Sequence, residues 1–151
     1  VIAITTVGFG LLLLAVDYNS QRVRDEYSMN WIDALIVGLF QSIAIIPGTS
    51  RSGITLTAGL LLGLTREAAT KFSFLLAIPT ILMSGALATL NLVVSGENVA
   101  WGDLIIGLIL SFIAAYICIH LFLKFIEKIG MLPFVIYRLA LGGVLFWLLY
   151  S

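Results

Sequence analysis

A polar heptapeptide, residues 47–53, interrupts a chain that is otherwise suited to lipid. Its sequence is Pro-Gly-Thr-Ser-Arg-Ser-Gly, and largely apolar runs precede and follow it at residues 34–46 and 54–64. An ionisable residue at membrane depth is costly and is retained mainly where it faces a cavity, a partner or a ligand. Three hydroxyls, two glycines and one guanidinium within seven residues indicate a candidate anion site, in which Arg51 needs an explanation.

The composition indicates an integral membrane protein made of helices. Of 151 residues, 61% are hydrophobic and 11% are charged, whereas a soluble domain carries about 25% charged residues. Several apolar stretches approach or exceed the roughly 20 residues that cross a bilayer as a helix, and the alternating segments of a membrane barrel are missing. The net charge of zero gives no reason to expect nucleic acid as a partner. The single cysteine, Cys118, allows no intrachain disulfide and implies no metal cluster.

The apolar segments predict four spanning helices and one shorter hairpin within a single membrane domain, residues 1–151. The hairpin limbs, residues 31–46 and 53–62, are about 15 and 10 residues long, or roughly 23 and 15 Å at helical rise. The second limb is too short to cross a core of about 30 Å, so residues 31–62 are predicted to form a re-entrant hairpin. The spanning helices are predicted at residues 1–16, 68–94, 104–123 and 134–150.

The positive charges support this topology. Six lysines and arginines flank the loops at residues 17–30, 63–71 and 124–132, whereas the turn at 95–102 has none. A re-entrant hairpin places all six on one side, which the positive-inside rule makes cytoplasmic, while a hairpin that crossed the membrane would divide them. The first limb then carries the loop past the midplane toward the outer leaflet. The six residues are Arg22, Arg24, Arg66, Lys71, Lys124 and Lys128.

The residue types of the loop fit a phosphate. Gly48 and Gly53 allow a tight turn and a close approach of the backbone to a ligand. We expect Ser52 to cap the limb that begins at Ile54, so that the first amides of that limb face the loop as an anion site. Arg51 adds a planar fork that can hold two phosphate oxygens. No Gly-Lys-Ser/Thr follows, so this is not a Walker loop. The alternative is a polar break between two helices, with the arginine reaching to the interface.

Other polar or small residues have weaker signals. Arg138 either lies near the interface or points inward, and His120 is expected to be hydrogen-bonded inside the bundle. Gly59 and Gly63 form a small-residue pair that favours close helix packing. Gln41 and Ser42 lie just before the loop on the first limb. Their side chains are predicted either to reach the same cavity as the loop residues or to point away from it.

Several motifs together resemble the bacitracin-resistance type of undecaprenyl-diphosphate phosphatases. The loop at residues 47–53 is followed by Gly-Leu-Leu-Leu-Gly at 59–63, Arg-Glu-Ala-Ala at 66–69 and the segment 72–79, and the match returns at 132–138. The resemblance implies that Arg51 is an active-site residue that binds the diphosphate and that Ser50 and its neighbours line the same pocket. The residues assigned are therefore Arg51 and Ser50 as catalytic, and Gly48, Thr49, Ser52 and Gly53 as substrate-binding.

The sequence also departs from the family. Family members build their site from two inverted re-entrant hairpins, and the other hairpin carries a Glu-x-x-x-Glu pair and a Ser-rich motif ending in Gly-His. Neither motif occurs here, so the chain resembles only the C-terminal half, the second half of an inverted repeat. The start at Val1, without an initiator Met or a charged segment, also favours a fragment over a signal peptide. We expect the N-terminal half of the same protein as a partner, a homodimer as a further option, and no catalysis by these residues alone.

The implied function is hydrolysis of undecaprenyl diphosphate to the monophosphate, which recycles the lipid carrier for peptidoglycan synthesis and confers bacitracin resistance. The implied location is the bacterial plasma membrane, crossed several times. The resemblance implies Mg²⁺ or Ca²⁺ as a cofactor. Hard cations prefer carboxylate oxygens as ligands, and no carboxylate lies near the loop in sequence, so no metal ligand is assigned. The alternative function is a transporter or flippase of a phosphate-bearing or anionic substrate, because broken helices in inverted repeats also build transporters. A structural half that only completes a partner chain is a third option.

Overall fold

The computed structural model describes all 151 residues and consists of helices without a sheet. Four of the helices, α1, α4, α5 and α6, are long and apolar enough to cross a membrane, so the predicted helical membrane fold is confirmed. The elements are α1 (Ile2–Asn19), the 3-10 turn η1 (Glu26–Ser28), α2 (Trp31–Ser42), the 3-10 turn η2 (Ile43–Ile45), α3 (Arg51–Leu61), α4 (Arg66–Val94), α5 (Trp101–Ile129) and α6 (Leu132–Tyr150).

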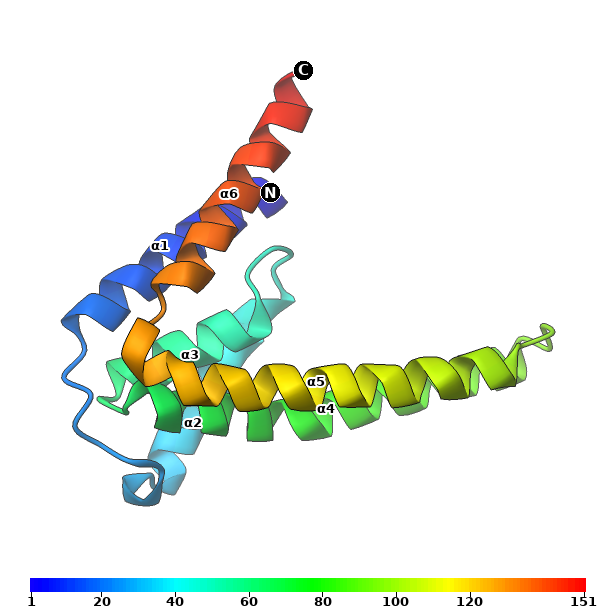
Figure 1. The fold of residues 1–151 in the computed structure, drawn as a ribbon, viewed down its shortest axis with the longest axis horizontal. Coiled ribbons are helices and arrows are strands. Elements are labelled where there is room, and N and C mark those ends of the chain that lie inside the picture. Colours follow the sequence, from blue (N-terminus) through cyan, green and yellow to red (C-terminus); the bar gives the residue numbers. More distant parts are fainter.

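Helices α1 and α6 lie side by side (Figure 1). They run in opposite directions, because residues 1–3 share a cleft with Leu145, Leu148 and Leu149 near the end of α6. Glycines allow the close approach: a Cβ on Gly142 would overlap the Val7 side chain. This pair forms a wall against which the tip of the predicted hairpin rests.

Helix α3 is the most enclosed helix of the chain. All residues from Gly53 to Leu60 are buried, and α3 packs against α1, α2 and α4. A Cβ on Gly59 would lie 2.9 Å from the Cβ of Ala69 in α4, so this glycine serves close helix packing as predicted. Gly63 does not share that role, because it lies beyond the end of α3 and adopts a φ of +83° in the turn to α4.

Arg24 ties the two ends of the α2–α3 hairpin together. Its guanidinium binds the Asp33 carboxylate in the first turn of α2, with N–O distances of 2.5 and 3.3 Å, and donates to the Leu62 carbonyl oxygen after α3 at 3.0 Å. The backbone N–H of Arg24 also donates to the Gly63 carbonyl oxygen at 2.9 Å. The hydrogen bond with Asp33 raises the pKa of Arg24. The start of α2 and the end of α3 therefore lie together, and the re-entrant course through a bilayer stays a prediction.

Further ion pairs join the neighbouring helices near this end of the hairpin. Arg66 at the start of α4 makes a bidentate pair with Asp17 of α1, at 2.7 and 3.0 Å. Lys71 lies 2.9 Å from a Glu26 carboxylate oxygen and 2.8 Å from one of Glu67. Paired Arg, Lys, Asp and Glu side chains at the ends of apolar helices keep most of the charge out of the apolar layer.

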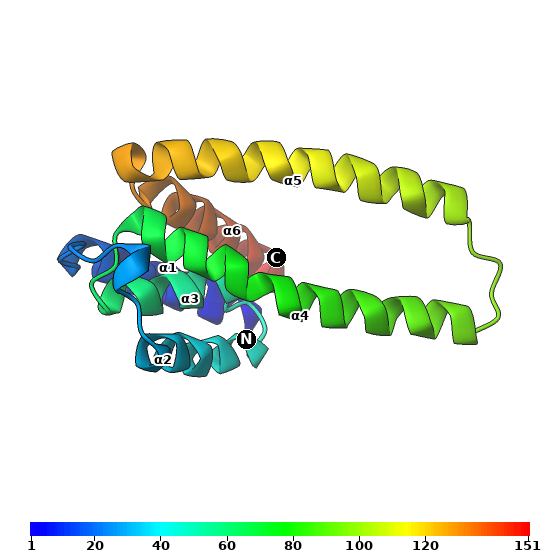
Figure 2. The ribbon, with the colours of Figure 1, turned by 90° about the horizontal axis from the view of Figure 1, so that it is seen from below.

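Helices α4 and α5 extend well beyond the other helices and are joined at their far end by a loop (Figure 2). Residues 81–94 of α4 and 101–121 of α5 are exposed along their whole length. His120 lies on this exposed part of α5, so the expectation that it is hydrogen-bonded inside the bundle is wrong for this chain. Helix α5 also extends past both predicted ends, because a helix can continue through residues that are too polar for the membrane.

Candidate functional site

The polar heptapeptide forms a tight loop that ends in the N-cap of α3. Gly48 has a φ of +90° and Ser50 a φ of +60°, an uncommon conformation for a residue with a side chain. The Ser50 hydroxyl accepts a hydrogen bond from the Gly53 N–H at 3.3 Å. Ser50 is therefore the capping residue, and the prediction that Ser52 caps the limb is wrong. The cap moves because α3 begins at Arg51, two residues earlier than predicted.

The loop carbonyls point toward α1 and α6. The Thr5 hydroxyl donates to the Pro47 carbonyl oxygen at 2.6 Å, and the Thr6 hydroxyl lies 3.4 Å from the Gly48 carbonyl oxygen. The Arg138 guanidinium donates to the carbonyl oxygens of Gly48 and Thr49, at 2.9 and 3.2 Å. Three consecutive carbonyls are thus engaged by side chains of the α1–α6 wall.

The loop amides are left for another partner. The backbone N–H groups of Ser50, Arg51 and Ser52 donate to no acceptor of the chain. These groups precede or begin α3, where the free amides and the positive end of the helix dipole attract anions. The Arg51 side chain is exposed and forms no ion pair within the chain. The geometry therefore offers three N–H donors and one free guanidinium at the same helix start.

The remaining residues assigned from sequence differ in what they can offer. The Ser50 and Ser52 hydroxyls lie 3.4 Å apart and both side chains are partly accessible. The Thr49 hydroxyl donates to the Ile46 carbonyl oxygen, and this residue is only 1% exposed. Gly53 is buried and serves the cap through its N–H. A ligand can therefore reach the two serine hydroxyls, whereas Thr49 shapes the turn; the binding roles of all these residues stay predictions.

Two polar residues before the loop have separate outcomes. The Ser42 hydroxyl donates back to the Leu39 carbonyl oxygen, and the residue is exposed. The side-chain oxygen of Gln41 is buried without a hydrogen-bond partner. Neither residue contacts the loop through a hydrogen bond.

Sequence reasoning did not identify the three residues that hold the loop carbonyls. For Arg138 the inward position was one of two interpretations, and its signal was a charge inside an apolar helix. Thr5 and Thr6 gave only a weak signal, two adjacent hydroxyls in the otherwise apolar α1. No local pattern indicates that α1 and α6, at opposite ends of the chain, meet at one loop, or that Arg138 binds a carbonyl 90 residues away.

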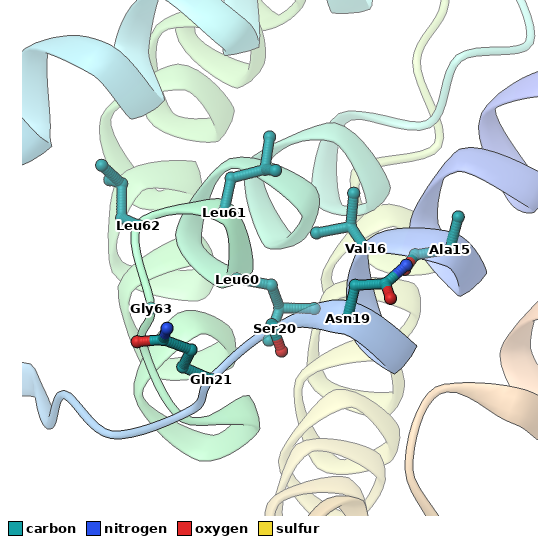
Figure 3. Close-up of a pocket in the computed structure, with 9 residues that line it drawn as sticks. All are labelled: Ala15, Val16, Asn19, Ser20, Gln21, Leu60, Leu61, Leu62 and Gly63. Atoms are coloured by element: carbon teal, nitrogen blue, oxygen red, sulfur yellow. The ribbon is translucent and has the colours of Figure 1, made fainter.

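An apolar cleft of about 280 Å³ adjoins the loop at Ser52. Its other walls come from α3, α4, α5 and α6: Leu56, Phe74, Cys118, Ile119, Phe122 and Phe134. A candidate anion site beside an apolar cleft fits an amphiphilic ligand. A second cleft, of about 560 Å³, lies at the other end of α3 between Asn19–Gln21 and Leu60–Gly63 (Figure 3). It contains no charged side chain and lies away from the loop, so we assign it no part in the site.

Carboxylates are concentrated away from the loop. Asp17, Asp33, Glu26 and Glu67 are paired with cations at the other end of the hairpin. No group of three histidine, cysteine or acidic side chains lies together in a way that could hold a metal ion. The loop can therefore bind an anion through amides, hydroxyls and Arg51, but it brings no carboxylate to a cation.

The fold and the loop together define a helical membrane protein with a polar loop between two short helices, whose free N–H groups and guanidinium make it a candidate anion site. The chain belongs to the family of the bacitracin resistance protein BacA, whose family model matches residues 1–144. The resemblance seen in the sequence motifs is thereby confirmed.

Curated bacterial proteins show the same relationship. The chain is 56% identical over 148 residues to the undecaprenyl-diphosphatase of Nitrosococcus oceani. The aligned residues make up 98% of this chain and 56% of that protein. It is 59% identical over 149 residues to the undecaprenyl-diphosphatase of Aliivibrio salmonicida, with 98% and 56% covered. It is 56% identical over 142 residues to undecaprenyl-diphosphatase 1 of Pseudoalteromonas translucida, with 94% and 53% covered. The chain thus spans about half the length of the curated relatives it matches.

Proposed function

We propose that the protein that contains this chain hydrolyses undecaprenyl diphosphate to undecaprenyl phosphate, and so recycles the lipid carrier for peptidoglycan synthesis at the bacterial plasma membrane. The names of the relatives support this function. The observation that carries it here is the loop, in which three backbone N–H groups and the Arg51 guanidinium are free while the carbonyls are engaged elsewhere.

The loop residues have defined roles in this proposal. Arg51 binds oxygens of the diphosphate, and the amides of residues 50–52 bind the others, so that both stabilise the charge that develops on the transferring group. The hydroxyls of Ser50 and Ser52 lie at the edge of the same site. The apolar cleft beside Ser52 holds the first part of the polyprenyl chain. Recognition of both ends distinguishes a lipid diphosphate from a soluble one.

The reaction breaks the anhydride P–O bond between the two phosphorus atoms. An oxygen that comes from water bonds to the terminal phosphorus, the lipid monophosphate leaves, and inorganic phosphate is the second product. This chain positions the diphosphate, and no loop residue is assigned as the nucleophile or the general base. We propose that they come from the N-terminal half of the same protein, which would make residues 1–151 inactive alone.

A requirement for Mg²⁺ or Ca²⁺ is part of the proposal through the family resemblance. These ions prefer several oxygen ligands that include carboxylates. The loop offers hydroxyl and carbonyl oxygens but no carboxylate, and its carbonyls are already hydrogen-bonded. The residues of this chain therefore do not fit such a site, and no step above depends on the ion.

The second candidate function is transport or flipping of a phosphate-bearing or anionic substrate. It is favoured by the broken helix pair α2–α3, since such pairs also form the substrate sites of secondary transporters. Transport needs the anion site but no hydrolysis, so an assay of phosphate release separates the two functions.

The test is phosphate release from undecaprenyl diphosphate by the full-length protein in detergent, with Mg²⁺ or Ca²⁺ present. Arg51→Ala is expected to lower kcat by about 100- to 1,000-fold, the usual effect of removing a group that stabilises transition-state charge. Arg22→Ala, which removes a cation far from the loop, is the matched control and should keep full activity. Activity of Arg51→Ala within a few-fold of the unmodified protein would contradict the proposed role, and no phosphate release by the unmodified protein would favour transport.

A further inference from the structure

Arg138 is a buried cation that the proposed reaction does not use directly. It lies in the apolar helix α6, is only 4% exposed, and has no carboxylate partner in the chain. A charge in such a place is costly and persists where it is fully hydrogen-bonded or serves a site. Its partners are the carbonyl oxygens of Gly48 and Thr49 in the candidate site.

We infer that Arg138 is a positioning residue of this site: it holds the Gly48 and Thr49 carbonyls toward α6, which fixes the direction of the free Ser50 amide and the position of the start of α3, where the amides of residues 51 and 52 and the Arg51 side chain lie. This inference rests on the proposed function. Each peptide unit has its N–H and C=O on opposite sides, so fixing the direction of a carbonyl also fixes that of the following amide. Holding the Thr49 carbonyl therefore orients the free N–H of Ser50, and holding the Gly48 carbonyl orients the N–H of Thr49, which closes the turn by donating to the Ile46 carbonyl oxygen.

An arginine fits this task better than other side chains. Its planar fork carries several N–H donors in fixed directions, so two neighbouring carbonyls can be held at once. A lysine would offer one mobile ammonium group, and a neutral amide would offer two donors on one nitrogen. Thr5 and Thr6 hold the same stretch from α1 through single hydroxyls, and the contact at Thr6 is long, 3.4 Å. Arg138 is thus the only donor that binds two of the loop carbonyls.

The charge of Arg138 has a second consequence. A Cβ on Gly53, in the first turn of α3, would lie 2.9 Å from one guanidinium nitrogen of Arg138, so the cation lies against the start of this helix. Since no carboxylate neutralises it, its charge adds to the positive end of the α3 dipole. The guanidinium can therefore favour an anion in the loop without touching it.

The first test measures phosphate release and loop protection in the same variants of the full-length protein. Arg138→Met keeps the length of the side chain and removes the donors and the charge, and we expect kcat to fall about 100-fold, the effect of a small misplacement of catalytic groups. Arg138→Met should also raise KM, because it removes the positive charge beside the loop. Arg138→Lys keeps that charge and should raise KM less. Amide hydrogen exchange should become faster at Thr49, Gly53 and Ile54, whose N–H groups are hydrogen-bonded only within the loop and its cap.

A pair of glycine variants provides a control for packing. Gly10→Ala adds a methyl group 3.5 Å from the Cβ of Arg138, an ordinary contact that leaves the guanidinium in place, and should change neither activity nor exchange. Gly53→Ala should displace the guanidinium, because its Cβ would lie 2.9 Å from a guanidinium nitrogen, and should imitate a weaker form of Arg138→Met; the same Cβ would lie 3.3 Å from the Ser50 hydroxyl, so part of its effect arises at the cap. Both variants and Arg138→Lys keep the question decidable if Arg138→Met does not fold.

The outcomes separate the inference from the function on which it rests. Faster loop exchange with a loss of activity in Arg138→Met and Gly53→Ala, but not in Gly10→Ala, supports the positioning role. Full activity, or lost activity with unchanged loop exchange, overturns it. If the unmodified protein releases no phosphate, the proposed hydrolysis fails, while the exchange data still decide whether Arg138 holds the loop.

Discussion

At the scale of single residues, the site depends on two backbone conformations that ordinary side chains avoid. Gly48 has a φ of +90° and Ser50 a φ of +60°. Glycine adopts such a φ without strain, whereas for Ser50 the strain is about 1–3 kcal/mol and persists where surrounding contacts over-determine it. Here the contacts are the hydrogen bonds of Thr5, Thr6 and Arg138 to the loop carbonyls. The loop is therefore held in place by the α1–α6 wall as well as by the hydrogen bonds of its own turn and cap.

Gly48→Ala tests this dependence. The added Cβ would overlap the Thr5 hydroxyl and lie 2.7 Å from the Ile2 carbonyl oxygen, and the left-handed conformation alone costs an L residue about 1–2 kcal/mol. We expect the loop to move away from α1 and phosphate release to fall at least tenfold. Gly38→Ala in α2, where nothing lies within 4 Å, is the matched control and should be silent in the same assay. Equal activity of the two variants would show that the loop does not need its contact with α1.

At the scale of secondary-structure elements, the hairpin α2–α3 is fastened at both ends by arginines. Arg138 binds its tip through backbone carbonyls, and Arg24 binds the first turn of α2 and the residue after α3. Short helices of about three turns are marginal alone, so tertiary contacts must supply the stability of this pair. The burial of α3 on all sides supplies much of it.

A double-mutant cycle tests the Arg24 contact. Arg24→Gln and Asp33→Asn should each lower the unfolding temperature of the protein in detergent, because each leaves a partly buried group without its charged partner. The two effects should not add, since both variants remove the same bidentate pair. Arg22→Gln, which removes a nearby arginine without hydrogen bonds, is the control. Strictly additive effects would mean that the pair does not hold the hairpin.

At the scale of the whole molecule, the topology is set by the number of times the chain crosses the membrane. With α2–α3 re-entrant, the loop before the hairpin and the end of α5 lie on the same side, and the α4–α5 turn lies opposite. The turn contains no lysine or arginine, which agrees with the positive-inside rule. A hairpin that crossed would place the first two on opposite sides.

Cysteine labelling distinguishes these topologies. In a Cys118→Ser background, single cysteines at Gln21, Glu97 and Lys128 are treated with a membrane-impermeant maleimide on intact cells. We expect labelling of Glu97→Cys alone, and labelling of the other two only after the cells are opened. Exposure of Gln21→Cys and Lys128→Cys on opposite faces would disprove the re-entrant hairpin.

The sequence by itself determined the class of the protein and the location of its candidate site. Apolar runs of about 20 residues have few alternatives to spanning helices, because backbone groups must be satisfied within the segment in lipid. The loop at residues 47–53 was equally evident, since polar side chains there contrast with everything around them. Local signals failed at a finer level: Ser52 was expected to cap the limb, but the cap is Ser50, because helix starts are set by backbone geometry that residue types alone do not specify.

Only the tertiary structure decided which loop groups remain free. Whether an amide or a carbonyl is available depends on its partner, and the partners here lie in α1 and α6, at the two ends of the sequence. Sequence spacing carries no information on such a meeting of distant helices. The sequence predicted that Arg51 belongs to an anion site, and the packing of α1 against α6 determined that the amides, not the carbonyls, of this loop are left free.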